Sequence, residues 1–309
     1  MRHRIEYAAM RALRCSMTPL PLDMASGVGA GIARALGRWP SVRRRARRNL
    51  VHAMPEMPEG ERERILTAMF DSFGRWGVEL LKRKRFAEDT ARFAVEGIEH
   101  LHAAASRGRG VVVLSAHYAN SEAVRLALAQ HDLVPALIYR TLNNPLIEAE
   151  MREGLEALGA PVFRKGKRGT LGLLRHVKAG GVAMILADQR FSGAPFLPFF
   201  GKPARTTLAP AEMALGHGAA LLTAHAEREG RSSRFRIHVD PPIPTEGRDA
   251  EAIMADYNAR LEGWIRKRPG QYFWLHHRWG PRAVGAKTVP SKRTPPPGAE
   301  ASERGPGAD

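Results

Sequence analysis

The spacing of apolar residues changes near residue 92 and divides the chain into two parts. Up to about residue 90, apolar side chains recur at helical spacing, which predicts helices over 4–14 and 61–83. Beyond that point, short apolar runs alternate with helical patterns. We expect strands at 111–115, 134–139, 182–186, 219–224 and 235–239, and helices at 121–130, 145–158, 170–178, 207–215 and 250–268. Such alternation predicts an α/β fold with a mostly parallel or mixed central sheet flanked by helices.

These patterns give three expected regions. Residues 1–90 form a helical, basic region at a membrane interface, residues 91–284 form the α/β core, and residues 285–309 form a tail. The tail is rich in Pro, Gly, Ala and charged residues, and it has too few apolar side chains to offset the entropy of ordering, so we expect disorder.

The glycines of 27–31 resemble a nucleotide-binding loop only in outline, because no strand precedes them. Close helix packing explains them better.

The strand expected at Val111–Ser115 ends beside the most informative residue of the chain, His117. Its wholly apolar run is typical of a strand buried on both faces. Ligands in open α/β sheets bind beyond the carboxyl ends of such strands, and His117 lies at that edge, with Glu122 opening the next helix. A histidine held by a carboxylate can take a proton from an alcohol, because imidazole titrates near neutrality. A purely structural His–Glu pair is the alternative, and spacing alone leaves both interpretations open.

Three further segments follow predicted strands and are placed to converge with His117 on one cleft. They are 139–145 with Arg140, the cationic loop 164–169, and Asp188 with Gln189. Backbone N–H groups and cations in a glycine-containing loop suit a phosphate ligand. Each segment also has a structural explanation. The loop is then a solvated turn, Arg140 an ion-pair partner, Asp188 a loop anchor, and the aromatic segment 196–200 part of the core.

The charge of the chain narrows its set of partners. The formal net charge is +17, and the first 50 residues hold eleven arginines against two acids. Arginine suits phosphate and carboxylate recognition, so such a surface attracts nucleic acid, an anionic membrane or an acidic protein. The single cysteine, Cys15, forms no internal disulfide and excludes zinc sites built on several cysteines.

The N-terminal region contains no segment typical of a spanning helix, which needs about 20 mostly apolar residues, and no secretory pattern. Residues 17–39 combine apolar side chains with Asp23, Arg34 and Arg38. This mixture suits a helix that lies in a membrane interface, where arginines meet anionic headgroups. A soluble helical hairpin with a basic face is the alternative.

Several other chemistries lack their motifs. The chain has no Gly-x-Ser-x-Gly elbow, no Walker loop and no HExxH zinc motif. His276 and His277 are adjacent, so in a strand they point apart and do not easily share one metal. We therefore expect neither a metal nor a cofactor.

In their order along the chain, the remaining motifs resemble one family, the late acyltransferases of lipid A biosynthesis of lauroyl and myristoyl type. That family belongs to the glycerolipid acyltransferase superfamily with its H-x4-D/E motif. Three positions depart from the family pattern: Ala119 in place of glycine, Ser121 in place of tryptophan, and Arg190 where an acidic or polar residue is common. The matching segments are His117 to Glu122, Tyr139-Arg140 with Asn144-Pro145, 164–168, Asp188-Gln189 with 198–206, and Tyr272 to Arg278.

The resemblance implies a reaction and a place for it. The reaction is transfer of a fatty acyl chain from an acyl carrier protein thioester to a hydroxyl of a lipid A precursor, at the cytoplasmic face of the inner membrane. His117 is the expected general base, and Glu122 is the carboxylate expected to hold its imidazole. No covalent enzyme intermediate is required, because a thiolate leaves readily.

The same resemblance implies the substrate-binding residues. Cations are expected to hold the phosphates of the acceptor or the phosphopantetheine of the donor. Arg164 or backbone N–H groups are expected to stabilise the oxyanion. Phenylalanines are expected to line a channel for the acyl chain. The expected residues are Asn120, Arg140, Arg164, Lys167, Arg168, Asp188, Gln189, Phe199 and Phe200, with Phe196 beside them.

Two alternatives stay open at the level of sequence. The first keeps the chemistry and changes the acceptor to a lysophospholipid or another polar lipid. The second is a basic nucleic-acid-binding protein, which explains the charge but neither His117 nor Asp188-Gln189, and the chain lacks cations interleaved with aromatics on strands. We therefore expect acyl carrier protein, a lipid acceptor and a membrane surface as partners, and no nucleic acid.

Overall fold

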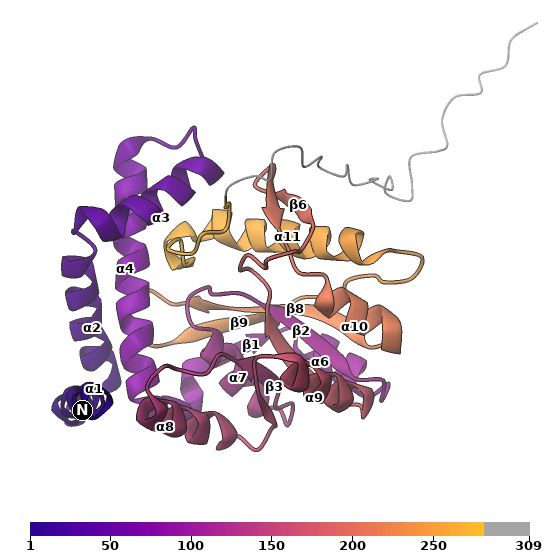
Figure 1. Cartoon of the computed structure of the whole chain (residues 1–309), viewed down its shortest axis with the longest axis horizontal. Coiled ribbons are helices and arrows are strands. Elements are labelled where there is room, and N and C mark those ends of the chain that lie inside the picture. Colours follow the sequence, from indigo (N-terminus) through magenta and orange to yellow (C-terminus); the bar gives the residue numbers. More distant parts are fainter. Residues whose placement is uncertain (281–309) are drawn as a thin grey trace, which may run out of the picture.

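A computed structural model describes residues 1–280 of the chain, and its centre is a seven-stranded sheet (Figure 1). Every neighbouring pair of strands is parallel except β8 and β9, which are antiparallel. This arrangement confirms the predicted α/β class with a mostly parallel sheet. The strand order is β1(Phe93–Glu96), β9(Phe235–Val239), β8(Ala220–Arg228), β2(Val111–Ser115), β5(Val182–Leu186), β3(Ala136–Tyr139) and β4(Val162–Arg164).

The central strand β2 explains why helices cover both faces of the sheet. All five of its residues are buried, and successive side chains of a strand point to opposite faces. Val111 and Val113 pack with α6(Ile98–Ala105) and α7(Ser121–Ala129) on one face. Val112 and Leu114 belong to the cluster on the other face. That cluster includes α9(Lys167–Lys178), α10(Ala209–His217) and α11(Ala250–Lys267).

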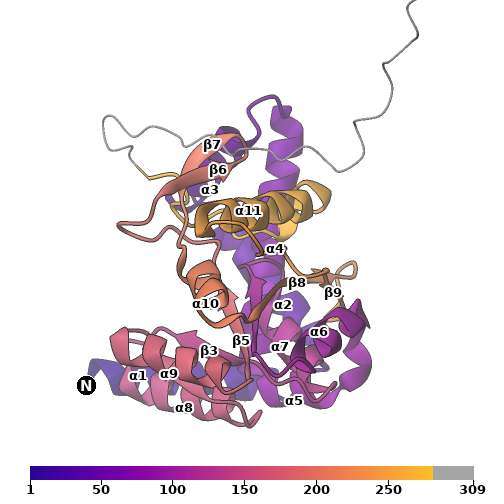
Figure 2. The same ribbon diagram turned by 90° about the vertical axis from the view of Figure 1, so that its right-hand side faces the viewer.

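Smaller elements complete the core. The helix α8(Pro145–Glu156) packs beside the sheet edge formed by β3 and β4. The predicted apolar segment after Gln189 forms a two-stranded hairpin, which lies on α11 (Figure 2). A short helix follows α11 and leads into the last described segment. The hairpin strands are β6(Phe196–Phe199) and β7(Lys202–Arg205), and the short helix is η2(Pro269–Gln271).

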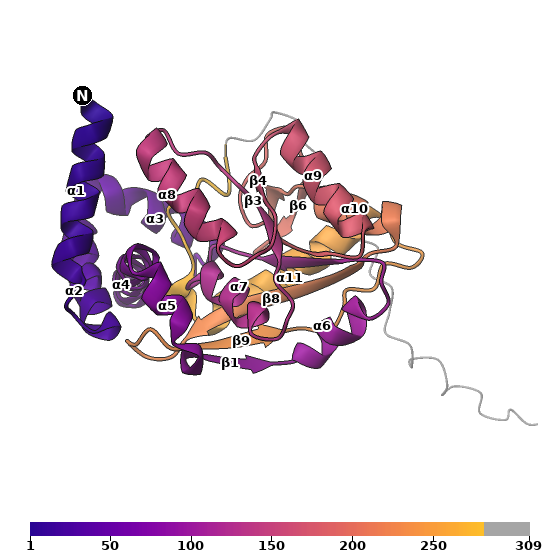
Figure 3. The same cartoon turned by 90° about the horizontal axis from the view of Figure 1, so that it is seen from below.

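The N-terminal residues form helices that gather on one side of the sheet, where α1 and α2 lie outermost (Figure 3). In the described residues, no helix combines the length and the apolar character needed to cross a membrane. The elements are α1(Arg2–Met17), α2(Leu22–Leu36), α3(Pro40–Ala53), α4(Glu59–Leu81), α5(Arg83–Glu88) and η1(Thr90–Arg92).

One of the glycines of α2, Gly29, serves helix packing as the sequence indicated, whereas a Cβ on Gly27 or Gly31 would meet no atom within 4 Å. Gly29 faces Gly74 of α4, and a Cβ on Gly74 would overlap the Gly29 carbonyl and lie 2.6 Å from the Cβ of Ala33. Two helices approach this closely only where neither carries a side chain at the contact.

Most predicted elements agree with the structure, and some do not. The strand β1 and the helix α6 were not predicted, because four-residue edge strands and short helices leave little periodic signal. The helix α9 begins at Lys167 rather than at residue 170. The predicted disordered tail from residue 285 lies outside the described residues.

Replacing Gly74 by alanine tests the close contact of α2 and α4. We expect Gly74→Ala to lower the free energy of unfolding by about 1–3 kcal/mol, because the added methyl group forces the two backbones apart. Gly77→Ala on the same helix is the matched control, since a Cβ there meets no atom within 4 Å. That variant should gain about 0.5–1 kcal/mol from helix propensity. Urea unfolding measures both, and equal effects would contradict the packing described here.

Candidate active site

The site is built where β2 and its neighbour β5 end. Their register pairs Ser115 with Leu186, the last residue of each strand. Two residues further along each chain stand His117 and Asp188, so the parallel register brings these side chains together. The Nδ1 atom of His117 lies 2.8 Å from the Oδ1 atom of Asp188. This edge of the sheet is where ligands bind in open α/β folds.

The carboxylate beside His117 is therefore Asp188, and the prediction that Glu122 holds the imidazole is corrected. Asn120 caps α7 by accepting a hydrogen bond from the Glu122 backbone N–H at 2.9 Å, and α7 then leads Glu122 away. The Glu122 carboxylate forms an ion pair with Arg83 of α5 and lies 3.7 Å from the guanidinium of Arg125. Spacing in the sequence suggested the nearer acid, whereas strand register selects the distant one.

The charges of this pair support each other. The Asp188 side chain is 1% exposed and that of His117 is 34% exposed. Burial opposes the charged form of His117, but the facing carboxylate outweighs it and raises the pKa of His117 above its ordinary value of 6.5. Burial likewise opposes the charged form of Asp188, but the charge and hydrogen bonds of His117, with help from Arg278, lower the pKa of Asp188.

A hydrogen bond from Nδ1–H to Asp188 leaves the lone pair on Nε2, which is the nitrogen that can accept a proton. The side-chain nitrogen of Gln189 lies 3.3 Å from His117 Nε2. The neighbouring His276 is engaged differently, because its Nε2 accepts a hydrogen bond from the Arg190 backbone N–H at 2.9 Å. Burial lowers the pKa of His276 to about 4, so this second imidazole stays neutral at physiological pH.

Buried Arg278 also stabilises the negative charge of Asp188. The guanidinium donates hydrogen bonds to Thr206 Oγ1 at 2.8 Å and to Asn258 Oδ1 at 3.3 Å, and the residue is 1% exposed. Arg278 closes the motif that begins at Tyr272. In the sequence, this motif contributed only to the family resemblance. The structure adds an electrostatic role for its last residue, Arg278.

The two phenylalanines expected to line an acyl channel are corrected, because both belong to the core. Phe199 is 0% exposed and Phe200 is 5% exposed. Phe199 stacks on Trp279 with ring centroids 5.3 Å apart, and Phe200 packs against Trp274. Hairpin β6–β7 packs this aromatic segment against α11. The segment is therefore part of the core, which was the alternative that the sequence left open.

Asn120 is also corrected as a substrate-binding residue, because it is buried at 2% exposure. Its amide donates to the buried Glu79 of α4 at 2.9 Å while its oxygen caps α7. It fixes the loop that carries His117.

The predicted cations lie exposed at the carboxyl ends of β3 and β4. Arg140 follows β3, while Lys167 and Arg168 begin α9, and all three are exposed. Arg164 is 61% exposed and donates to Tyr139 Oη at 3.3 Å, with Glu148 3.3 Å away. Arg164 is therefore partly neutralised, whereas the other three cations keep their charge available.

An aromatic wall that the sequence did not single out lies beside His117. Phe273 has its ring centroid 6.3 Å from that of His117 and 5.2 Å from that of Phe73 on α4. Trp76 extends the wall one turn further, 5.4 Å from Phe73. Helical spacing of Phe73 and Trp76 indicated a core face, yet Phe73 is 37% exposed. The convergence joins residues 200 positions apart, which no local pattern reveals.

Within residues 1–280, no three His, Cys, Asp or Glu side chains gather in a way that could hold a metal ion. The site offers a proton acceptor with a buried counter-charge, an amide and aromatic rings beside it, and exposed cations at the carboxyl ends of β3 and β4 of the same sheet. This set of groups suits proton transfer from an alcohol next to an apolar chain.

Comparison with known proteins places the chain among acyltransferases. Residues 2–280 match the family described as Bacterial lipid A biosynthesis acyltransferase. The chain is 30% identical over 280 residues to the Lipid A biosynthesis palmitoleoyltransferase of Escherichia coli (strain K12), covering 88% of each chain. It is 25% identical over 242 residues to the Phosphatidylinositol mannoside acyltransferase of Mycobacterium tuberculosis (strain ATCC 25618 / H37Rv), covering 75% of this chain and 76% of the relative.

Among solved structures, the chain matches a 1-acyl-sn-glycerophosphate acyltransferase from Thermotoga maritima. The TM-score is 0.37 at 14% identity, over 65% of this chain and 86% of the other.

Proposed function

Because the chain belongs to the bacterial lipid A biosynthesis acyltransferase family, we propose that it moves a fatty acyl chain from an acyl carrier protein thioester to a hydroxyl group of a lipid A precursor. The observation that carries this proposal is the pair of His117 and Asp188 at the carboxyl edge of the sheet, 2.8 Å apart. A base with a buried counter-charge at this edge is what transfer to an alcohol requires.

In the proposed mechanism, Nε2 of His117 takes the proton of the acceptor hydroxyl as its oxygen attacks the thioester carbonyl. The tetrahedral intermediate collapses by breaking the carbon–sulfur bond, and the thiolate recovers the proton from the imidazolium. Asp188 keeps the Nδ1–H tautomer in place and stabilises the imidazolium between the two steps. The acyl group never bonds to the enzyme.

The developing oxyanion needs a donor close to Nε2. The Gln189 amide, 3.3 Å from Nε2, stands nearest to the reacting atoms, whereas the guanidinium of Arg164 is engaged with Tyr139 and Glu148. We assign the donor role to Gln189 and leave Arg164 to the cationic rim. Removing such a donor typically costs about 2.7–4 kcal/mol of transition-state stabilisation.

Charged and apolar parts of the substrates are assigned to different groups of residues. Arg140, Lys167 and Arg168 are exposed cations that suit the phosphates of the acceptor or of the donor arm. The aromatic wall of Phe73, Trp76 and Phe273 suits the acyl chain, and about 0.8 kcal/mol per buried methylene makes such a wall sensitive to chain length.

A membrane surface is the proposed place of action, because the outer face of α2 is apolar and exposed. Its apolar residues are spaced by four, so they form one stripe, while the opposite face packs on α4. Exposed arginines follow at 38, 44, 45 and 48. An apolar stripe flanked by arginines suits an anionic bilayer, such as the cytoplasmic face of the inner membrane. The stripe consists of Met24, Val28, Ile32 and Leu36, with Trp39 after it.

A second acceptor class has support from the comparisons. A relative at 25% identity is a phosphatidylinositol mannoside acyltransferase, so a polar lipid other than a lipid A precursor remains the alternative acceptor. The nucleic-acid alternative does not explain why the buried carboxylate of Asp188 faces His117.

Replacement of His117 tests the proposed function. We expect His117→Ala to lower kcat/KM by about 10²–10⁴-fold in folded enzyme given acyl carrier donor and lipid A precursor, because no other group accepts the hydroxyl proton. Product mass should show one added acyl group on the precursor. His102→Ala, an exposed histidine on α6, is the matched control and should keep the wild-type rate.

The proposal fails if His117→Ala turns over at the wild-type rate. Product mass on a lysophospholipid but not on the lipid A precursor would instead move the acceptor to the alternative class. Tight gel-shift binding of nucleic acid that is indifferent to acyl donor would favour the nucleic-acid hypothesis.

The membrane proposal is tested by flotation with vesicles of phosphatidylethanolamine and phosphatidylglycerol. We expect Val28→Asp combined with Ile32→Asp to reduce the bound fraction at least about tenfold, because two charges enter the apolar stripe. Leu171→Asp with Leu215→Asp is the control, since both leucines are exposed on other helices. Equal flotation of the two double variants would contradict a role for α2.

A further inference from the structure

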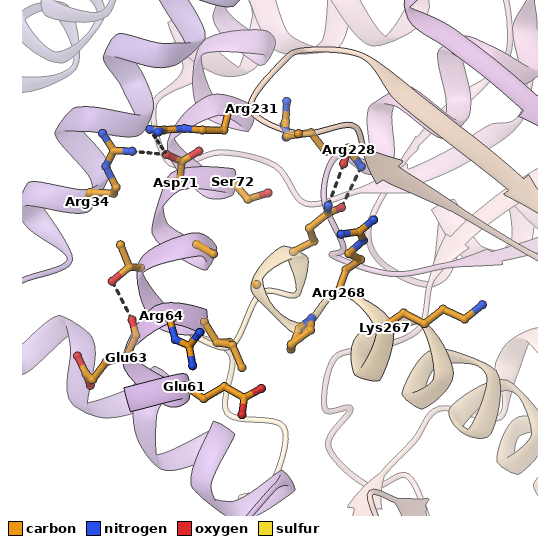
Figure 4. A pocket seen from close by; sticks show the side chains of 17 residues that line it. Arg34, Glu61, Glu63, Arg64, Asp71, Ser72, Arg228, Arg231, Lys267 and Arg268 are labelled. Carbon is orange, nitrogen blue, oxygen red and sulfur yellow. Dashed lines mark hydrogen bonds and ion pairs between the residues drawn. The ribbon is translucent and has the colours of Figure 1, made fainter. Parts of the chain in front are cut away.

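A cleft of about 790 Å³ opens between α4, the turn after β8 and the end of α11 (Figure 4). One wall is α4, where Thr67 and Ala68 are exposed, and the opposite wall is formed by β8 and the turn that follows it. The short helix η2 forms the floor. Gly270 of η2 lies so close to α4 that a Cβ would stand 2.6 Å from the Cβ of Ala68. The cleft is large enough for a sizeable ligand group.

The side chains around this cleft are mainly basic. Six basic and three acidic residues line it. Two of the acids are already neutralised, Asp71 by Arg34 and Glu63 by Arg43. The third, Glu61, lies in the first turn of α4, where a negative charge favours the helix. The rim therefore keeps an excess of positive charge. Its basic residues are Arg34, Arg64, Arg228, Arg231, Lys267 and Arg268.

Four of these cations are exposed, and they come from three different elements. Arg231 is 70% exposed and lies 3.4 Å from Asp71, and Arg268 is 62% exposed and pairs with Glu227 at 3.0 Å, so these two are partly neutralised. Arg64 and Lys267 are exposed and form no ion pair within residues 1–280. In Figure 4 these four lie on different sides of the cleft and do not converge on one point. A spread of cations around an open cleft suits an extended acidic surface better than a single phosphate.

The wall of the cleft also holds a polar group without a partner. Ser72 is 7% exposed, and its buried hydroxyl makes no hydrogen bond within the described residues. Figure 4 shows this side chain directed from α4 toward the wall that carries Arg228. A buried hydroxyl without a partner is costly in free energy.

The cleft adjoins the catalytic loop. The carbonyl of Gln271, which lines the cleft, accepts a hydrogen bond from the Ala119 backbone N–H at 2.7 Å. Two residues later, the Phe273 backbone N–H donates to the His117 carbonyl at 3.1 Å. Two extended residues span roughly 7 Å. Gln271 in the cleft lining is therefore two residues of chain away from the backbone contact with His117.

We propose that this cleft docks an acidic carrier protein, whose acidic surface meets Arg64, Arg231, Lys267 and Arg268 while its acylated arm reaches past residues 271–273 to His117. The inference rests on the proposed function, because it names the surface that receives the donor of that reaction. Docking by exposed charges makes donor capture sensitive to ionic strength. The docking surface shares no residue with the cations at the carboxyl ends of β3 and β4.

Charge reversal in the cleft tests this docking surface with two donors, lauroyl-acyl carrier protein and lauroyl-pantetheine, which carries the same thioester without the protein. We expect Arg231→Glu combined with Lys267→Glu to raise KM for the carrier protein donor about tenfold, equivalent to about 1.4 kcal/mol, with kcat unchanged. KM for lauroyl-pantetheine should not change. KM of the wild-type enzyme for the carrier protein donor should rise with salt, and this rise should be smaller in the variant.

The matched control is Arg107→Glu combined with Arg109→Glu, which makes the same change of charge in the exposed loop at the amino end of β2. It should leave KM for both donors unchanged. The proposal is overturned if this control raises KM as much as the cleft variant does, or if the cleft variant raises KM equally for both donors. The second result would indicate a site for a small anion. Absence of wild-type turnover with either donor would instead reject the proposed function itself.

Discussion

The contact on which this molecule depends is the one between His117 and Asp188, and it is a product of strand register. Ser115 pairs with Leu186 at the ends of two parallel strands, so the residues two positions beyond them must meet. Burial of Asp188 would be unfavourable without a counter-charge, and the imidazole and the guanidinium of Arg278 supply it. A slip of one residue in this register would turn the side chains to opposite faces and dissolve the pair.

A second buried carboxylate holds the loop in which this contact is made. Glu79 of α4 is 0% exposed and binds Arg228 at the end of β8, with Nη2 and Oε2 at 2.9 Å. The same carboxylate accepts from Ser233 at 2.7 Å and from Asn120 at 2.9 Å. Because Asn120 caps α7 directly after the catalytic loop, α4 fixes the position of that loop. The N-terminal helices therefore shape the site.

The sequence predicted the frame of the site better than its contacts. The bounds of β2 and β5 follow from apolar runs typical of buried strands, and those of β9 from alternating apolar and polar residues, while His117 and Asp188 stand just beyond strand ends. The predicted partner of His117, Glu122, was wrong. Glu122 is close in sequence, but the register of two strands that are distant in sequence places Asp188 beside His117. For Phe199 and Phe200, the sequence does not separate a place in the core from a place in an acyl channel, because aromatic side chains line both. The meeting of Phe73 with Phe273 crosses 200 residues and has no local signal.

The most direct test of the central claim is an NMR titration of the His117 imidazole in three forms of the protein. The wild-type pKa should lie above the ordinary value of 6.5, because the Asp188 carboxylate stabilises the imidazolium. Asp188→Asn removes that charge with little change of shape, so the pKa of His117 should fall and the acid limb of kcat/KM should move to lower pH. Glu122→Gln should leave the pKa of His117 in place. A fall in Glu122→Gln with none in Asp188→Asn would contradict the account.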